Sequence, residues 1–273
     1  MNTIKSLALV GVAATALFAA QAFGTVCPPG TQGSPTCIAT TGGDGPGTSL
    51  QQQLNDMTTS GPDINVYTGQ YTPSSYWSIG ASDSSVNKIL LELAGNASTN
   101  TFGIYDPSNP ANYLQLFSGP ATAGYSTLLT QVGNTFIATY FNGSGHFEGQ
   151  SEITINGNVF GYYLGAASAT PTFFSDPTLN EAGGGTYPNG MHHMVAYAGN
   201  GQTYLNGKSF LSGEYLLAWE DLPWGSSDLD YNDFVVLVES VHAVPEPGVL
   251  GMFGLGALLM GLFAGLRRRS WNA

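Results

Sequence analysis

Basic residues are scarce in this chain. Of 273 residues, 6 are Lys or Arg, against 18 Asp and Glu. Apart from Lys5 and three arginines near the C-terminus, only Lys88 and Lys208 are basic. Because proteins bind nucleic acids and anionic lipid surfaces through clustered Lys and Arg, neither is expected as a partner of the body of the chain. Cations and cationic surfaces are better candidates.

Cysteine is also rare, since Cys27 and Cys37 are the two present. Their spacing does not match the CxxC pairs of zinc sites. In an oxidising compartment we predict one disulfide between them, which closes a small loop near the mature N-terminus. Two free thiols or half of a metal site are the alternatives.

Charged residues make up only 9 % of the chain, whereas aromatic residues make up 12 %. So many aromatic side chains exclude the class of disordered acidic tails. The roughly 220 residues between the two apolar ends are enough for one domain with a hydrophobic core, or for two small ones.

Long amphipathic helical patterns are missing as well. Residues 23–60 form a Pro/Gly-rich arm, in which only Leu50–Met57 favours a helical turn or two. From there the chain alternates short runs rich in β-branched and aromatic residues with turn residues. The sequence therefore predicts an all-β fold over residues 61–242, an antiparallel β-sandwich or jelly-roll-like domain.

The expected strands and turns follow the same signals. Asn-Gly pairs, typical of two-residue hairpin turns, stand at 142–143, 156–157 and 206–207, and residues 153–160 give the clearest hairpin prediction. The predicted strands cover residues 64–71, 86–93, 113–117, 134–141, 146–155, 159–164, 191–198, 214–220 and 234–241.

The N-terminus has the pattern of a secretory signal peptide. Lys5 lies in a short polar start, an apolar run covers residues 7–20, and Ala20-Gln21-Ala22 is a small-x-small site. We expect the Sec translocon to export the chain and signal peptidase to remove residues 1–22. An N-terminal membrane anchor is the alternative.

The C-terminal residues 243–273 have three parts in a fixed order. Val244-Pro245-Glu246-Pro247 comes first, an uncharged stretch covers residues 248–266, and Arg267, Arg268 and Arg269 follow. Nineteen residues reach about 28 Å as a helix, close to the ~30 Å hydrocarbon core of a bilayer. The positive-inside rule places the arginines in the cytoplasm and the body of the chain outside. A simple tail anchor or a buried core helix is the alternative.

This tripartite pattern resembles the PEP-CTERM sorting signal of proteins exported by Gram-negative bacteria. The resemblance implies recognition by an exosortase, which cuts near Val244–Pro247 and passes the protein to the cell surface or the exopolysaccharide matrix. Pro245 and Pro247 disfavour helix in the residues before them, which keeps the segment extended and accessible to a protease. The membrane is then a partner of the C-terminal helix at least transiently.

The highest concentration of acidic side chains lies in a loop at residues 220–234. Six acidic residues fall between Glu214 and Asp233, and crowded carboxylates repel one another unless a cation intervenes. Hard oxygen ligands favour Ca²⁺. The pattern Asp228-x-Asp230-x-Asn232 begins like an EF-hand, but Asp233 replaces the required Gly and a strand follows, so an EF-hand is rejected. Capping of backbone N–H groups is the alternative role of these side chains.

The same loop resembles the end of an uncharacterised β-rich domain family of secreted bacterial proteins. The shared features are the E-D-x-P-x-G-x-x-D-x-D-[YF]-N-D-[FV] signature and matching residues upstream, over about 155–242. The resemblance implies Ca²⁺ binding, and no catalysis is established for the family. By this resemblance the metal ligands are Asp228, Asp230, Asn232 and Asp233, with Glu220 and Asp221 beside them.

These features together predict an exported, non-enzymatic protein of the cell envelope, cell surface or extracellular matrix, with Ca²⁺ stabilising its acidic loop. One alternative is a carbohydrate-binding or carbohydrate-active protein of the exopolysaccharide matrix. Another is an adhesin subunit that assembles through sheet edges. His192-His193 suggests a metal ligand only if a carboxylate joins one of the two rings, because neighbouring side chains on a strand point to opposite faces.

Overall fold

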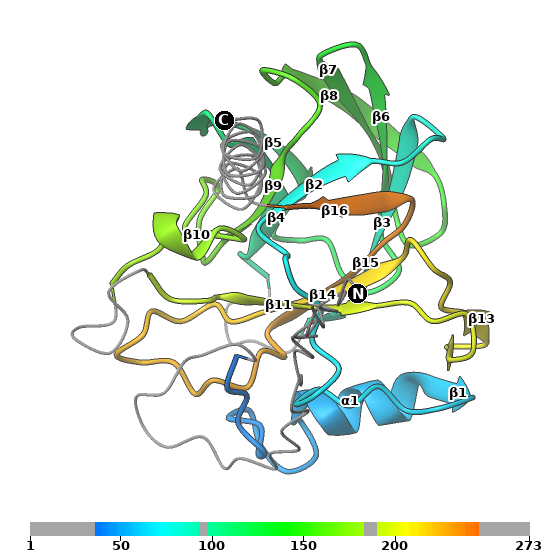
Figure 1. The fold of residues 1–273 in the computed structure, drawn as a ribbon, viewed down its shortest axis with the longest axis vertical. Coiled ribbons are helices and arrows are strands. Elements are labelled where there is room, and N and C mark those ends of the chain that lie inside the picture. Colours follow the sequence, from blue (N-terminus) through cyan, green and yellow to red (C-terminus); the bar gives the residue numbers. More distant parts are fainter. Residues whose placement is uncertain (1–35, 93–97, 183–189, 246–273) are drawn as a thin grey trace, which may run out of the picture.

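The computed structural model describes residues 36–92, 98–182 and 190–245. Two antiparallel sheets face each other, and the predicted β-sandwich is confirmed (Figure 1). The larger sheet contains, in spatial order, β11 (Met194–Ala198), β14 (Tyr215–Trp219), β15 (Phe234–Val238), β3 (Ser84–Glu92), β6 (Ser126–Val132), β7 (Thr135–Phe141) and β8 (Phe147–Thr154). The smaller sheet contains β10 (Phe173–Phe174), β9 (Gly161–Gly165), β4 (Thr101–Asp106) and β5 (Asn109–Phe117).

Smaller elements surround the two sheets. The short strands β1 (Thr58–Ser60), β12 (Tyr204–Leu205) and β13 (Lys208–Ser209) form a three-stranded ribbon, and β2 (Tyr76–Ile79) pairs with β16 (Val241–Val244). The helix α1 (Leu50–Met57) and the 3-10 turn η1 (Pro177–Leu179) complete the described elements. Ser49 caps α1 by accepting a hydrogen bond from the Gln52 N–H.

The main core lies between the two sheets and is rich in aromatic rings. Trp77 and Phe102 are fully buried there, together with Tyr162 and Phe234. The Phe102 ring stacks on Tyr162 at 5.3 Å between centroids and on Phe234 at 5.5 Å. Such pairs add about 0.5–1.5 kcal/mol each beyond the area that they bury.

A second core lies on the opposite face of β11, β14 and β15. Along β14, Leu217 faces the main core, whereas Leu216 and Ala218 pack in the second core against Leu50 and Leu54 of α1. The arm residues 36–57 therefore form a third layer over the sandwich (Figure 1). Strands that are buried on both faces need continuous apolar sequences, which explains the runs YLLAW and FVVLV.

Most predicted strands are confirmed, but the predicted hairpin at 153–160 is wrong. Strand β8 belongs to the larger sheet and β9 to the smaller one, so the Asn156-Gly157 turn carries the chain across a corner of the sandwich. Ile155 and Phe160, on either side of the turn, are both buried in the main core, which a local hairpin would not achieve. The Asn206-Gly207 turn between β12 and β13 is the expected two-residue hairpin, with φ of 50° and 80°.

Three further differences concern which residues form strands. Residues 64–71 form turns instead of a strand, because the Asn65 side chain accepts hydrogen bonds from the N–H groups of Tyr67 and Thr68. The predicted strand 234–241 is broken at Ser240, whose φ is 59°. The sequence analysis did not predict β2, β4 and β6, nor the short strands β1, β10, β12, β13 and β16.

No described helix has the length and apolar character needed to cross a bilayer. The predicted signal peptide 1–22 and the predicted span 248–266 lie outside the described residues.

Candidate metal centre

Six carboxylates meet at one end of the larger sheet. They fall into three overlapping groups whose ligand atoms lie within 4.8 Å of one another in each group. The groups are Asp44, Asp230 and Asp233; Glu220, Asp228 and Asp230; and Glu220, Asp221 and Asp233. The predicted acidic loop connects β14 to β15 and supplies five of the six.

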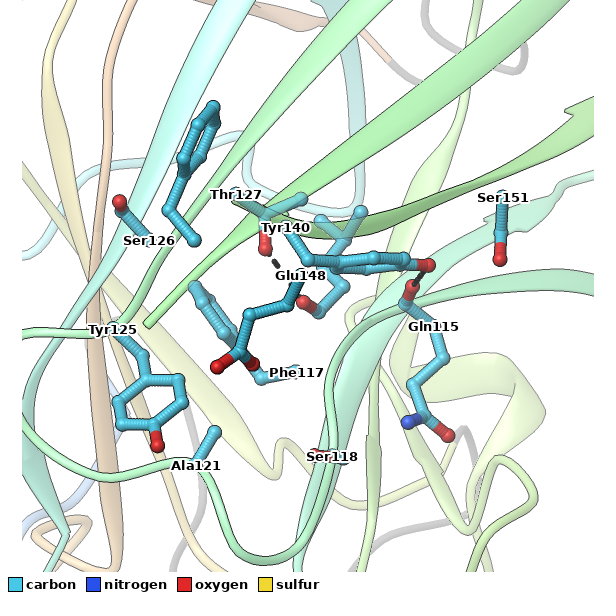
Figure 2. A pocket seen from close by; sticks show the side chains of 12 residues that line it. Gln115, Phe117, Ser118, Ala121, Tyr125, Ser126, Thr127, Tyr140, Glu148 and Ser151 are labelled. Carbon is cyan, nitrogen blue, oxygen red and sulfur yellow. Dashed lines mark hydrogen bonds between the residues drawn. The ribbon is translucent and has the colours of Figure 1, made fainter. Parts of the chain in front are cut away.

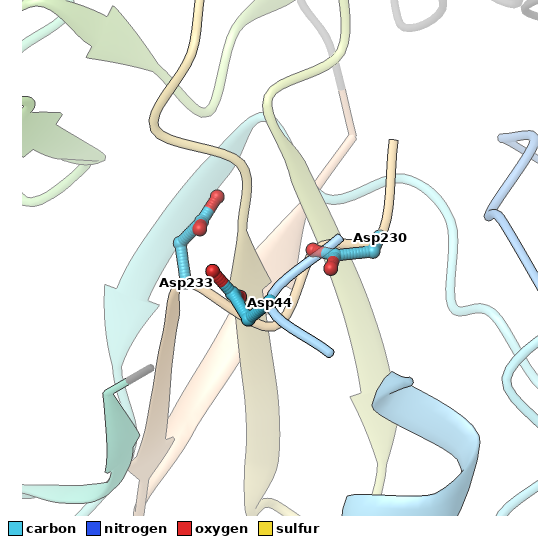
Figure 3. A group of neighbouring side chains, drawn as sticks. All are labelled: Asp44, Asp230 and Asp233. Atoms are coloured by element: carbon cyan, nitrogen blue, oxygen red, sulfur yellow. The ribbon is translucent and has the colours of Figure 1, made fainter. Parts of the chain in front are cut away.

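Asp44 comes from the arm, 176 residues before the loop begins at Glu220, and the sequence analysis missed it. Figure 3 shows its carboxylate between those of Asp230 and Asp233. A usable signal was present, because Asp44 is the lone acidic residue of the segment 23–49 and stands in the turn-forming Gly42-Gly43-Asp44-Gly45.

Backbone hydrogen bonds hold the arm against the loop. The Gly43 N–H donates to Asp230 Oδ2 at 2.8 Å, and the Ala39 N–H donates to the Leu229 carbonyl at 2.7 Å. In return, Asn232 Nδ2 donates to the Thr48 carbonyl at 2.6 Å. The acidic loop thus positions a segment that is distant in sequence.

The loop backbone is unusual where the ligands are densest. Leu229 and Tyr231 adopt left-handed conformations with φ of 60° and 56°. Each such conformation costs of order 1 kcal/mol or more and persists only when its surroundings enforce it. Tyr231 supplies part of that enforcement, because its ring is fully buried in the second core and its hydroxyl donates to the His192 carbonyl at 2.6 Å.

Two buried oxygens in the cluster have no hydrogen-bond partner among the described residues. They are Glu220 Oε2 and Asn232 Oδ1, and both residues are 0 % exposed. Leaving a buried acceptor unsatisfied costs about 1–3 kcal/mol, and more if it is charged. The predicted capping role is also present, since the Asp221 N–H donates to Asp233 Oδ2 and the Asn232 N–H to Asp230 Oδ1. Capping alone leaves the two buried oxygens unexplained.

The electrostatics of the site strongly disfavour a full set of negative charges. Burial, followed by the charges of Glu220 and Asp221, raises the pKa of Asp233 to about 9. Burial also raises the pKa of Asp230 to about 6. The pKa of Glu220 shifts upward from burial and from the charges of Asp228 and Asp230. Within the described part of the chain, no Lys or Arg forms an ion pair with these carboxylates.

The structure brings together all six predicted ligands: Glu220, Asp221, Asp228, Asp230, Asn232 and Asp233. Asn232 joins them through its Nδ2, which donates to Asp230 Oδ2 at 2.8 Å. Glu239, the twelfth position of the rejected EF-hand, follows β15 and lies away from the cluster, in a pocket with Lys88 and Lys208.

A histidine–carboxylate pair supports the first part of the loop. His193 Nε2 lies 3.0 Å from Glu181 Oε1, which also accepts the Trp224 N–H, while His193 Nδ1 lies 3.0 Å from the Glu220 carbonyl. The His193 ring stacks on Phe173 at 3.6 Å. Burial alone would raise the pKa of Glu181, but hydrogen bonds from His193 and Trp224 and the charge of His193 lower it to about 2. The buried His193 and the partly exposed Glu181 therefore hold residues 220–224 in place.

The other predicted residues are only partly described. Val244 ends β16 and Pro245 follows it as an exposed residue, whereas Glu246, Pro247 and Arg267–Arg269 lie outside the described residues. Cys37 is described but Cys27 is not, so their disulfide stays a prediction.

Comparisons with known proteins bear on one part of the chain. Residues 150–241 are similar to a family described as a domain of unknown function (DUF4114). That stretch contains the acidic loop but not Asp44. No curated protein matches the chain.

One solved structure is similar to this chain, that of Caenorhabditis elegans galectin LEC-6. The identity is 12 %, the match covers 68 % of this chain and 91 % of the galectin, and the TM-score is 0.15. A TM-score this low supports no conclusion about fold or ligand.

Proposed function

We propose that this protein is an exported, non-enzymatic component of the cell surface or extracellular matrix, in which Ca²⁺ fastens the N-terminal arm to the β-sandwich. The observation that carries the calcium site is the gathering, in three overlapping groups, of six carboxylates, five of which belong to the same loop as the buried, unpartnered oxygens of Glu220 and Asn232. A cation at this place offsets the repulsion and satisfies both oxygens.

Calcium fits the ligand set better than other common metals do. The available ligands are carboxylate and amide oxygens, without a cysteine or histidine in any of the three groups. Zn²⁺ prefers nitrogen and sulfur ligands. Mg²⁺ keeps several waters and uses one or two carboxylates, whereas Ca²⁺ accepts six to eight oxygens in flexible geometry.

A bound metal would stabilise the third layer, which the arm residues 36–57 form over the sandwich. The arm covers the outer face of β11, β14 and β15 through Ile38, Leu50 and Leu54. Asp44 gives this arm a ligand in the same cluster as the loop. Bound Ca²⁺ therefore stabilises the tertiary packing of segments far apart in sequence, as expected for a protein that works outside the cell, where calcium is abundant.

Calorimetry and thermal unfolding of the full chain, purified in mild detergent, test the calcium site. A ligand at about 100 times its Kd stabilises a protein by about 2.7 kcal/mol. For a domain of this size that corresponds to roughly 5–10 °C in Tm. We expect EGTA to lower the Tm by that amount, and added CaCl₂, but not an equal concentration of MgCl₂, to restore it. An unchanged Tm together with no heat of calcium binding would contradict the proposal.

Export is proposed on the C-terminal sequence pattern, and the structure offers one supporting feature. Val244 is the last residue of β16, and Pro245 directly after it is exposed, so the second residue of the proposed sorting motif is accessible. This arrangement suits cutting by an exosortase next to the membrane.

Fractionation of cells with epitope tags placed after residue 22 and after Ala273 tests the export proposal. The mature protein should keep the first tag, lose the second, and be degraded when protease is added to intact cells. Replacing Arg267–Arg269 by Ser should disturb this processing. A chain that keeps both tags and resists external protease would refute it.

A further inference from the structure

A second candidate site lies where β5, the edge strand of the smaller sheet, faces β6, β7 and β8 of the larger sheet. A cavity of about 460 Å³ opens there. This volume falls in the range of small-molecule sites, about 300–1,000 Å³. The cavity shares no residue with the metal centre.

A β-bulge directs a carboxylate into this cavity. Tyr140 pairs with Gly149 and Phe141 pairs with Phe147, so Glu148 is an extra residue in β8 without a partner in β7. Gly149 has φ of 140°, a conformation that favours glycine, which lets the strand resume its register. Bulges of this kind re-aim side chains and are common beside binding sites. Figure 2 shows the Glu148 carboxylate pointing toward the side of the cavity where Tyr125 and Phe117 lie.

Aromatic rings form the apolar part of the cavity wall. Tyr125 is half-buried against the main core and keeps part of its ring in the cavity. The ring of Tyr140 is held by its hydroxyl, which donates to the Gln115 carbonyl at 2.8 Å (Figure 2). These rings are therefore positioned before any ligand arrives, which reduces the ordering cost of binding.

Several polar side chains around the rings are available to a ligand. Gln115, Ser118 and Ser126 line the cavity, as does Ser151, and none of their side chains forms a hydrogen bond with another described residue. Together with Glu148 they present acceptors and donors at the edge of an aromatic surface.

We propose that this cavity binds a neutral sugar unit of a polysaccharide. A sugar ring has apolar C–H faces that pack on aromatic rings and hydroxyl groups that pair with carboxylate, amide and hydroxyl side chains. An anionic ligand is disfavoured because the described lining contains a carboxylate and no Lys or Arg. A simple organic cation would pair with Glu148 but leave the amide and the three serines unused.

The site binds without cleaving. Glycoside hydrolysis normally needs two carboxylates across the scissile bond. Glu148 is the sole acidic residue of the described lining, and the nearby Glu152 does not belong to it.

Isothermal titration of the full chain in calcium buffer, with cellotetraose, maltotetraose, mannotetraose and galactotetraose as separate probes, tests this proposal. Choline chloride and oligoalginate serve as the cationic and anionic probes. We expect at least one neutral tetrasaccharide to bind, and Tyr125→Ala and Glu148→Gln each to weaken its Kd by about tenfold or more, equal to about 1.4 kcal/mol. The matched controls Tyr204→Ala and Glu152→Gln change an exposed tyrosine and an exposed glutamate outside the cavity and should leave the Kd within about twofold.

Three outcomes would overturn the assignment: no neutral probe binds, only choline or alginate binds, or the sugar Kd is the same in Glu148→Gln as in the wild type. Glu148 is exposed, so its variant should fold even if Tyr125→Ala loses stability. Release of shorter sugars from the probe would overturn the statement that the site binds without cleaving. Because the two sites share no residue, failure here leaves the calcium proposal untouched, and the reverse holds as well.

Discussion

The backbone N–H of Gly43 donates a 2.8 Å hydrogen bond to Oδ2 of Asp230, a residue 187 positions later in the chain. Gly43 also approaches Asp228 so closely that a Cβ on Gly43 would lie 1.5 Å from Asp228 Oδ2. A side chain at position 43 would therefore displace the carboxylate of Asp228 from its present place.

Replacing this glycine should therefore disturb the metal centre. In Gly43→Ala the new methyl group pushes Asp228 out of its place beside Glu220 and Asp230, and we expect calcium affinity to fall by about tenfold or more. Isothermal titration with CaCl₂ measures the change.

Gly225→Ala is the matched control for Gly43→Ala. Gly225 lies in the same acidic loop, yet a Cβ there would meet no atom within 4 Å. Calcium affinity should stay at the wild-type value in this variant. If Gly43→Ala also binds calcium normally, the close approach of Gly43 to Asp228 is not needed for the site.

Neutralising one buried ligand should have opposite effects with and without calcium. Asp233→Asn keeps an oxygen that can accept the Asp221 N–H but removes a charge repelled by Glu220 and Asp221. We expect the calcium-free variant to be at least as stable as the wild type and the calcium-bound variant to be less stable. Thermal unfolding in EGTA and in CaCl₂ gives both comparisons.

Asp63→Asn provides the control, because Asp63 is exposed and lies outside the metal-ligand groups. The Asp63→Asn variant should unfold at the wild-type temperature both in EGTA and in CaCl₂. An Asp233→Asn variant that gains as much stability from calcium as the wild type would show that the side chain acts through capping alone, because the Asn oxygen keeps the cap.

The calcium-free protein should lose stability as the pH rises. Folding raises the pKa of Asp230 to about 6 and that of Asp233 to about 9, from ordinary values near 3.8. The folded state then binds more protons than the unfolded state between these limits, so its free energy of unfolding decreases with pH. The stabilising contribution is complete below about pH 4 and declines above it; the part from Asp230 is lost by about pH 6 and the part from Asp233 by about pH 9.

Urea unfolding in EGTA from about pH 5 to about pH 9 measures this slope. Because calcium binds the deprotonated carboxylates, the gain in stability from CaCl₂ should grow over the same range. A calcium-free protein that becomes more stable toward pH 9 would contradict the burial of these acids.

Glu181 should show the opposite dependence. Its pKa is lowered to about 2, so the stability that its charge contributes is present above about pH 4.5 and is lost as the pH falls through 2. Glu181→Gln weakens the bonds to His193 and to the Trp224 N–H, and we expect a loss of about 1–2 kcal/mol at neutral pH. The difference from the wild type should narrow toward pH 2.

Urea titrations at several pH values measure this difference, and Glu152→Gln serves as the control because Glu152 is exposed on β8. A constant difference between the Glu181→Gln variant and the wild type over the whole acid range would show that the charge of Glu181 contributes nothing.

The acidic loop shows which part of the candidate site could be predicted from the sequence. Asp228, Asp230, Asn232 and Asp233 are close in sequence, and crowded carboxylates imply a shared cation or cap regardless of the rest of the fold. Asp44 was not predictable in the same way, because its distance from the loop is set by the packing of α1 on the second core.

The hairpin prediction at 153–160 failed for a similar reason. The Asn156-Gly157 turn has the right local chemistry, but burial of Ile155 and Phe160 between the sheets decides which strands pair. The continuous apolar runs of β14 and β15 carried a signal that was not used: such strands require cover on both faces.

The amino-acid sequence determined the β-rich character, the positions of most strands and the acidic loop, because these depend on side-chain patterns within a few neighbouring residues. Tertiary structure alone decided that the arm forms a third layer, that Asp44 completes the acidic cluster, and that Glu148 points into a cavity opposite Tyr125. These features depend on contacts between segments far apart in the chain, where burial of apolar surface outweighs local preference.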